Sequence, residues 1–204
     1  MLINLLKFLK KILSIEKTRI LFFLKHIKNN VNISYKLNLK NFKNITLGKE
    51  NRIGEFVTLF CWNKNSSINI GNNCVIENYG ILEALKGSIE IGNNSTVNQF
   101  SIFRAYGNIK IGNGVRIGPN VQIMAMNHKF DDQNKYIYEQ GLEGKGISIG
   151  NNVWIGGGVI ILDGINIGNN CVVGAGTVVT KNIPDNSLVV GNPGKVIKKL
   201  NFNI

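Results

Sequence analysis

The stretch ISIGNNVWIGGGVIILDGINIGNNCVVGAGTVV, residues 147–179, places an aliphatic residue at every sixth position. A period of six between short β-branched segments is typical of a parallel β-helix, in which three short strands form one triangular coil. Because Gly and Asn tolerate the φ/ψ angles of sharp corners, their positions mark the bends. We expect the side chains of this series to point inward: Ile149, Ile155, Ile161, Ile167, Val173 and Val179.

The same strand-and-turn signature occurs six times along the chain. It stands at 45–48, 68–71, 89–92, 109–112, 147–150 and 165–168, so the spacings are 23, 21, 20, 38 and 18 residues. Hexads without long corner loops indicate the left-handed form, an exception to right-handed crossover. The sequence predicts an all-β, left-handed parallel β-helix of about six coils at residues 41–199, with small insertions in the early coils. It also predicts a basic helical appendage at 1–40 and a tail at 200–204.

The positive charge is concentrated near the N-terminus. Of the net charge of +12, residues 1–50 contribute +9, from eleven Lys or Arg and two Glu. The remaining residues hold thirteen Lys or Arg against ten Asp or Glu. A nucleic-acid-binding domain needs a basic face, so the near balance of the repeats predicts no nucleic-acid partner.

The N-terminal segment combines apolar residues at helical spacing with lysines. It contains no apolar run near the ~20 residues that span a bilayer, and no signal-peptide cleavage pattern follows it. Two interpretations stay open: residues 1–28 lie on anionic lipid at the inner face of the plasma membrane, or they form a helical pair on the core or a neighbouring subunit. The apolar positions are Leu5, Leu6, Leu9, Ile12, Leu13, Ile20, Leu21, Phe23 and Leu24.

Two residue types bear on the environment of the chain. Cys61, Cys74 and Cys171 are odd in number and show no CxxC spacing, so we expect free, buried thiols in a reducing cytoplasm. His26 lies in the basic appendage, where we expect a solvated side chain.

The repeat is interrupted once, by MNHKFDDQNKYIYEQGLEGKG at residues 126–146. The hexad series reaches Ile123 before this stretch and resumes at Ile149, so the sequence predicts an extruded loop at 127–146 that leaves the coils in register. Asn127 and His128 stand at the last corner before the loop. An imidazole fixed there could take a proton from a hydroxyl group; the simpler alternative is an ordinary surface histidine.

The last coils carry more specific motifs: VWIG at 153–156, VGAGTVVTK at 173–181 and GNPGKVI at 191–197. Residues 68–199 thereby resemble the hexapeptide-repeat acyltransferases, especially the branch with maltose, galactoside and polysaccharide O-acetyltransferases and streptogramin acetyltransferases. The resemblance implies a homotrimer that binds acetyl-CoA in the groove between adjacent β-helices, without a metal. A β-helical carbonic anhydrase would need three histidines around zinc, and the coils contain only His128. A purely structural β-helix would have no reason to carry these motifs.

The resemblance also implies roles for residues. His128, beside Asn127, matches the general base, and the Gly157 N–H matches the donor to the oxyanion. Asp131 and Asp132 are candidates to orient the imidazole. The positions that match the acetyl-CoA site are Trp154, Gly156, Gly157, Ala175, Thr180, Lys181, Lys195 and Lys198, the three lysines facing phosphates. The family often has Arg at the last two.

Acceptor recognition is the least determined part. Asn98, Arg104 and Asp131 are the candidate substrate contacts. Arg104 stands where galactoside enzymes carry acidic residues, which argues against a simple galactoside acceptor and leaves room for an acidic one. The function we expect is O-acetylation of a carbohydrate hydroxyl in surface polysaccharide synthesis (capsule, O-antigen or exopolysaccharide). The alternative is N-acetylation of a nucleotide-linked amino sugar, or acetylation of a streptogramin-type xenobiotic.

Overall fold

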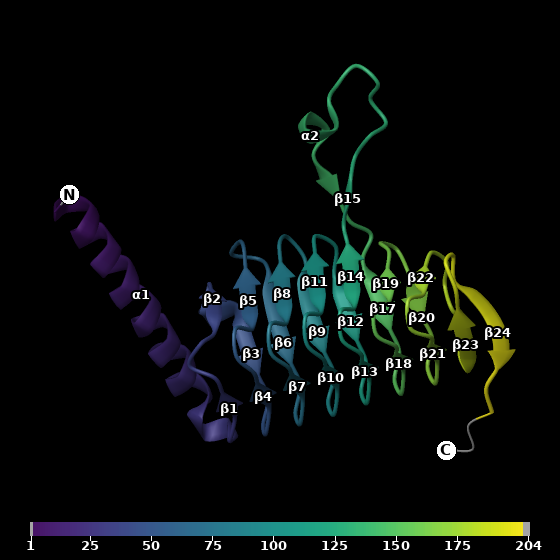
Figure 1. Cartoon of the computed structure of the whole chain (residues 1–204), viewed down its shortest axis with the longest axis horizontal. Helices are drawn as coiled ribbons and strands as arrows, with labels where there is room; N and C mark the ends of the chain where they lie inside the picture. Colours follow the sequence, from purple (N-terminus) through teal and green to yellow (C-terminus); the bar gives the residue numbers. More distant parts are fainter. Residues whose placement is uncertain (1, 202–204) are drawn as a thin grey trace.

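The computed structural model describes residues 2–201, with side chains described from residue 13 onward. Three parallel sheets form the faces of a triangular prism, a single helix lies at its N-terminal end and a hairpin at its C-terminal end (Figure 1). This arrangement confirms the left-handed parallel β-helix. Sheet B, defined below, has seven strands, one per coil, so the chain forms about seven coils where the sequence predicted six.

Strands of successive coils stack in parallel in each sheet, and sheet A also includes the antiparallel strand β24. Sheet A contains β1 (Asn32–Ile33), β4 (Arg52–Ile53), β7 (Val75–Ile76), β10 (Thr96–Val97), β13 (Arg116–Ile117), β18 (Trp154–Ile155), β21 (Val172–Val173), β23 (Ser187–Val190) and β24 (Lys195–Lys199). Sheet B contains β2 (Asn38–Lys40), β5 (Thr58–Cys61), β8 (Ile81–Ala84), β11 (Ile102–Ala105), β14 (Gln122–Ala125), β19 (Ile160–Ile161) and β22 (Val178–Val179). Sheet C contains β3 (Ile45–Leu47), β6 (Ser67–Ile70), β9 (Ser88–Ile91), β12 (Ile109–Ile111), β17 (Ile147–Ile149) and β20 (Asn166–Ile167).

The core is a stack of inward-pointing aliphatic side chains. Ile155 pairs in register with Ile117 and Val173, and all three are fully buried. Ile161 pairs with Ile123 in the same way on sheet B. The predicted inward orientation of the hexad series is therefore confirmed, and each coil buries its apolar surface against the next.

An asparagine ladder closes the corner between sheets C and A. The Oδ1 atom of Asn72 accepts the N–H of Lys49 from the preceding coil at 2.7 Å. The same contact recurs at 2.7 to 2.8 Å down the prism, with Asn93, Asn113, Asn151, Asn169 and finally Asp185 as acceptors. A coil corner leaves backbone N–H groups without a strand partner, so the first Asn of each Gly-Asn-Asn motif supplies the missing acceptor.

The early coils are longer because of their sheet B strands. β5, β8, β11 and β14 have four residues each, whereas β19 and β22 have two. The extra residues expected from the 20–23 spacing therefore extend one face. The first coil begins with β1 at Asn32, inside the range 1–40 assigned from sequence to the appendage.

The appendage is one helix, α1 (Leu2–His26), followed by the short 3₁₀ turn η1 (Ile27–Asn29), and not a helical pair. Its last turns cover the first coil, where Phe22 is buried. Lys25 Nζ donates to the carbonyl of Ile45 at 2.7 Å, and Arg19 Nε donates to that of Leu37 at 2.9 Å. The helix thereby covers the open strand edges at this end of the solenoid.

His26 corrects an expectation, because it is buried with 2% of its surface exposed and is not solvated. Its Nδ1–H donates to the Phe22 carbonyl at 3.0 Å, and its Nε2 accepts the Leu47 N–H at 3.1 Å. A carbonyl only accepts and an N–H only donates, so these contacts require the neutral imidazole. Burial, aided by the nearby Lys25 charge, lowers the pKa of His26, although its hydrogen bond to Phe22 opposes the shift.

The opposite face of α1 is open. Leu13, Ile20, Leu24 and Ile27 are each more than half exposed. Within residues 2–201, no helix combines the length and hydrophobicity needed to cross a bilayer. The side chains of Leu5, Leu6, Leu9 and Ile12, and residues 202–204 of the expected tail, lie outside the described residues.

Candidate active site

The predicted loop leaves the prism after β14 and returns at β17, and it stands out from the stack of coils (Figure 1). Its neck is a two-stranded antiparallel ribbon of β15 (Asn127–His128) and β16 (Leu142–Glu143), and α2 (Ile137–Gln140) lies farther out. Asn127 pairs with Glu143, and His128 pairs with Leu142. His128 is exposed and lies at the base of the loop, one residue from where the chain leaves the coil corner.

Asp163 ties the two strands of the neck to the following coil. Its carboxylate accepts the Lys145 N–H at 2.9 and 3.0 Å and the Gly146 N–H at 2.9 Å, both in the returning segment between β16 and β17. It also accepts the Asn127 side-chain amide at 3.2 Å, on the outgoing strand. Sequence reasoning missed Asp163. One signal was present: Asp163 comes two residues after Ile161, whereas Ala125 comes two residues after Ile123, the register partner of Ile161.

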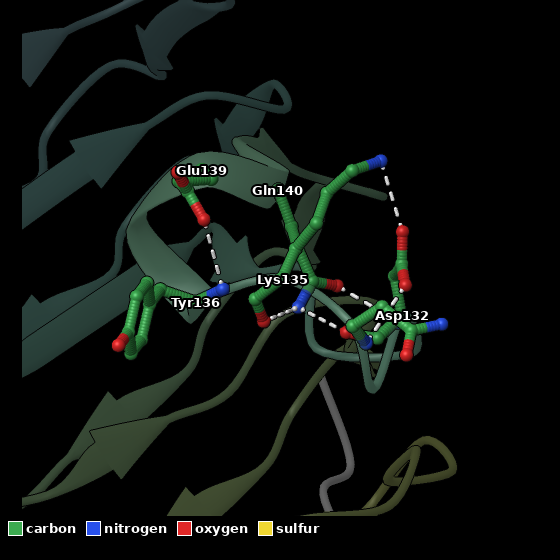
Figure 2. A network of polar contacts seen from close by, with 6 residues as sticks. Asp132, Lys135, Tyr136, Glu139 and Gln140 are labelled. Carbon is green, nitrogen blue, oxygen red and sulfur yellow. Dashed lines mark hydrogen bonds and ion pairs between the residues drawn. The ribbon is translucent and has the colours of Figure 1, made fainter.

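The outer loop is braced by its own residues (Figure 2). The Asp132 carboxylate accepts Lys135 Nζ at 2.9 Å and the Asn134 N–H at 3.0 Å, and these contacts lower the pKa of Asp132. Gln140 Nε2 donates to the carbonyls of Asp132 and Lys135, and Glu139 accepts the Tyr136 N–H. Within residues 2–201 neither Asp131 nor Asp132 is hydrogen-bonded to His128, so the structure does not bring these candidates to the imidazole.

Gly156 and Gly157 form the corner between β18 and β19. A Cβ at Gly156 would lie 2.6 Å from the Ala175 nitrogen, so only glycine fits there. At the equivalent corner of the second coil, the Glu55 N–H donates to Asn78 Oδ1 at 2.8 Å. The next coil offers Gly157 only Ala175, so no partner for the Gly157 N–H occurs in the described part of the chain. This amide is available to an incoming oxyanion.

The residues expected to hold the cofactor lie in three places. Gly156, Gly157 and Ala175 share the corner just described, and Trp154, 58% exposed, precedes it on sheet A. Thr180, Lys181 and Lys195 line a hollow of about 300 Å³ beside the C-terminal hairpin. Lys198 lies on β24 opposite Leu188, exposed and outside that lining.

The acceptor candidates have partners that sequence reasoning did not assign. Arg104 Nε donates to Glu83 Oε2 at 2.9 Å, in register across β8 and β11, so a carboxylate already balances its charge. The Asn98 side-chain amide donates to the Ile117 carbonyl at 2.8 Å and braces its corner. Asp131, in the outer loop, completes the predicted set.

The candidate residues fall on two different corners. Asn98, Gly157 and Ala175 lie where sheet A turns into sheet B, whereas His128, Thr180 and Lys181 lie where sheet B turns into sheet C. The width of sheet B separates these corners within one chain, so the structure does not bring His128 to Gly157.

The cysteines lie in the core, away from both corners. Burial raises the pKa of the Cys61 thiol to about 11, and it also raises the pKa values of Cys74 and Cys171. A thiol held protonated is a poor nucleophile. Within residues 2–201, no cluster of three or more metal-ligating side chains occurs.

Comparisons with known proteins agree with this geometry. The family model for "Bacterial transferase hexapeptide (six repeats)" matches residues 146–181. A putative acetyltransferase of Dictyostelium discoideum is 52% identical over 93 residues, 45% of this chain and 47% of that protein. Nodulation protein L of Rhizobium leguminosarum bv. viciae is 53% identical over 89 residues, 43% of this chain and 45% of that protein. The chain spans about half the length of the curated relatives it matches.

Two solved structures extend the likeness. A galactoside acetyltransferase in complex with coenzyme A is 38% identical, with a TM-score of 0.52 over 55% of this chain and 56% of that chain. A maltose O-acetyltransferase from Clostridium difficile 630 is 30% identical, with a TM-score of 0.52 over 93% of this chain and 86% of that chain. On this shared sequence, repeat and fold, the chain belongs to the hexapeptide-repeat acyltransferase family.

Proposed function

We propose that the protein is an O-acetyltransferase that moves the acetyl group of acetyl-CoA to a carbohydrate hydroxyl in surface polysaccharide synthesis. The observation that carries the proposal is the free Gly157 N–H, at a glycine corner of a chain that also holds His128 on a braced neck. The similar maltose and galactoside enzymes support a carbohydrate acceptor.

The reaction is a direct transfer. His128 takes the proton of the acceptor hydroxyl as its oxygen attacks the thioester carbonyl carbon. The negative charge that develops on the carbonyl oxygen is stabilised by the Gly157 N–H. Collapse of the tetrahedral intermediate breaks the C–S bond, and the departing thiolate takes the proton from the imidazolium. The buried cysteines support a route without an acyl-enzyme.

This route needs two copies of the chain, because His128 and Gly157 lie on different corners of one prism. A cyclic homotrimer lets the loop corner of one copy face the glycine corner of the next, which forms three equivalent sites. The pantetheine arm would run along the small residues Gly156 and Ala175. Lys181 and Lys195 would then bind the phosphates at the C-terminal hollow.

The test uses purified protein, acetyl-CoA and a panel of maltose, a galactoside and an acidic oligosaccharide. We expect an acceptor that gains one acetyl mass which mild alkali removes, as an ester requires. An alkali-stable product would point to N-acetylation and contradict the O-ester. Absence of CoA binding by calorimetry at millimolar concentration would overturn the acyltransferase assignment.

We also propose that α1 brings the enzyme to an anionic membrane surface. Ile20 and Leu24 are exposed on a helix with several lysines, and Ile27 is exposed in the turn η1 that follows, a combination typical of interfacial binding. The full chain should sediment with vesicles that contain phosphatidylglycerol and not with phosphatidylcholine vesicles. Replacing Ile20 and Leu24 by Glu should abolish the effect. Equal sedimentation of this variant and the wild type, or dissociation of the variant into monomers, would instead favour another role for these exposed apolar residues.

A further inference from the structure

The returning end of the loop lies closely against the coil beneath it. A Cβ at Gly144 would lie 2.3 Å from the Gly107 nitrogen and 2.6 Å from the Ala125 oxygen, so the returning strand presses directly on the coil. Gly146 has φ of +97°, a conformation that L side chains rarely adopt. The chain therefore re-enters the prism on a path with little freedom.

The carboxylate of Asp163 accepts from three donors and pairs with no cation in the described residues. Two donors are backbone N–H groups of the returning segment, Lys145 and Gly146. The third is the side chain of Asn127, next to His128 on the outgoing strand. A carboxylate that bonds the outgoing strand and the returning segment of the loop holds the two together at the base of the ribbon.

Register explains why an acid stands here. In an earlier coil, the Ser88 N–H donates to Oδ1 of Asn108, its neighbour in the next coil. Gly164 lies beside Gly146 in the same way, because its N–H donates to the Gly146 carbonyl, and a glycine has no side-chain acceptor to offer. Asp163, the residue before Gly164, accepts the Gly146 N–H in its place and reaches the Lys145 N–H and the Asn127 side chain as well.

We propose that Asp163 is a positioning residue for His128, a role that rests on the function proposed above. It sets the imidazole through Asn127 and the neck ribbon and touches neither acetyl-CoA nor the acceptor. Because the loop emerges on the neighbour's side of the site, a small tilt of the neck moves the general base away from the acceptor hydroxyl. A displacement of about 1 Å costs roughly 100-fold in rate.

The experiment compares Asp163→Ala and Asp163→Asn with wild type. We expect Asp163→Ala to lower kcat of acetyl-CoA turnover, measured with maltose and with water as acceptor, by about 100-fold, while CoA affinity stays within about twofold. Asp163→Asn keeps one acceptor oxygen and should recover part of the loss. The matched control is Asp185→Asn, at a carboxylate that accepts the Asn169 N–H on a different corner, and it should keep wild-type kcat.

Hydrogen exchange separates positioning from a purely structural role. The Lys145 and Gly146 amides should exchange faster in Asp163→Ala, while the core amides of Ile155 and Ile161 keep their protection. Faster exchange of the Lys145 and Gly146 amides with unchanged kcat would overturn the positioning role. Unchanged exchange of these amides would show that Asp163 does not hold the neck. A wild type without any acetyl-CoA turnover would refute the proposed function, and the exchange comparison would still decide whether Asp163 holds the neck.

Discussion

His128 owes its place to the backbone of the neck more than to a side-chain partner. It stands on a two-residue strand opposite Leu142, and the carboxylates once expected to orient it are either engaged elsewhere or not hydrogen-bonded to it in the described residues. The group proposed to stabilise the oxyanion is also a backbone group, the Gly157 N–H, which has no acceptor in the described residues because Ala175 of the next coil offers no side-chain oxygen. Both proposed catalytic groups are thus set by register within the coils.

Removal of the imidazole should abolish chemistry without loss of binding. We expect His128→Ala to lower kcat by roughly 10²- to 10⁴-fold, the usual contribution of general-base catalysis. Calorimetry should show unchanged CoA affinity, because His128 is not among the residues that line the C-terminal hollow. A variant that retains wild-type kcat would remove His128 from the mechanism.

The Gly157 N–H can be deleted with little change of shape. Pro119 occupies the equivalent position of the preceding coil, so the corner accepts a proline, and Gly157→Pro removes only the donor. We expect kcat to fall by about 10²- to 10³-fold. Gly157→Ala keeps the N–H and is the control, although its Cβ would lie 3.3 Å from the Pro119 oxygen. Equal kcat for the proline and alanine variants would contradict the oxyanion role.

The elements that the six-residue period defines could be predicted from sequence, and the contacts at the N-terminal end could not. The hexads predicted the coils, the inward series and the extruded loop, because these depend on a short period that the sequence displays. Strands β1 and β2 were assigned to the appendage, although Ile33, Leu39 and Ile45 keep the six-residue period, and their pairing with β4 and β5 places them in the first coil. The burial of His26 depends on Leu47, 21 residues away, and no local pattern reveals that contact.

The docking of α1 should depend on pH through His26. Its pKa is lowered in the folded chain from the usual 6.5, so the unfolded chain takes up the proton more readily. The stability that the neutral imidazole provides is present above about pH 6.5 and is lost as pH falls below that value toward the folded pKa. Tm should therefore fall between about pH 7.5 and pH 5.

The variant His26→Leu tests this pH dependence of Tm. It cannot titrate, so the fall of Tm over that interval should flatten. At about pH 7.5 it should cost roughly 1–3 kcal/mol, because the Leu47 N–H loses its acceptor. An equally steep decline in the variant would assign the pH dependence to other groups.

The whole molecule explains why the site could be predicted only in part. The residues of the motifs were found from sequence, and three of them, Thr180, Lys181 and Lys195, do line one hollow. Asp163 and the Glu83–Arg104 pair were not found, because each depends on which residues neighbouring coils place side by side. The separation of His128 from Gly157 was also not found, because it depends on which corner of the prism each residue occupies, and that requires the coil boundaries.

The most direct test of the two-copy site mixes two inactive variants. His128→Ala and Gly157→Pro subunits are co-expressed with different tags, and oligomers that carry both tags are isolated. Each mixed trimer then has one interface where an intact His128 faces an intact Gly157, so activity should return to about one third of wild type per trimer. Mixed oligomers no more active than either parent variant would contradict a site built from two copies of the chain.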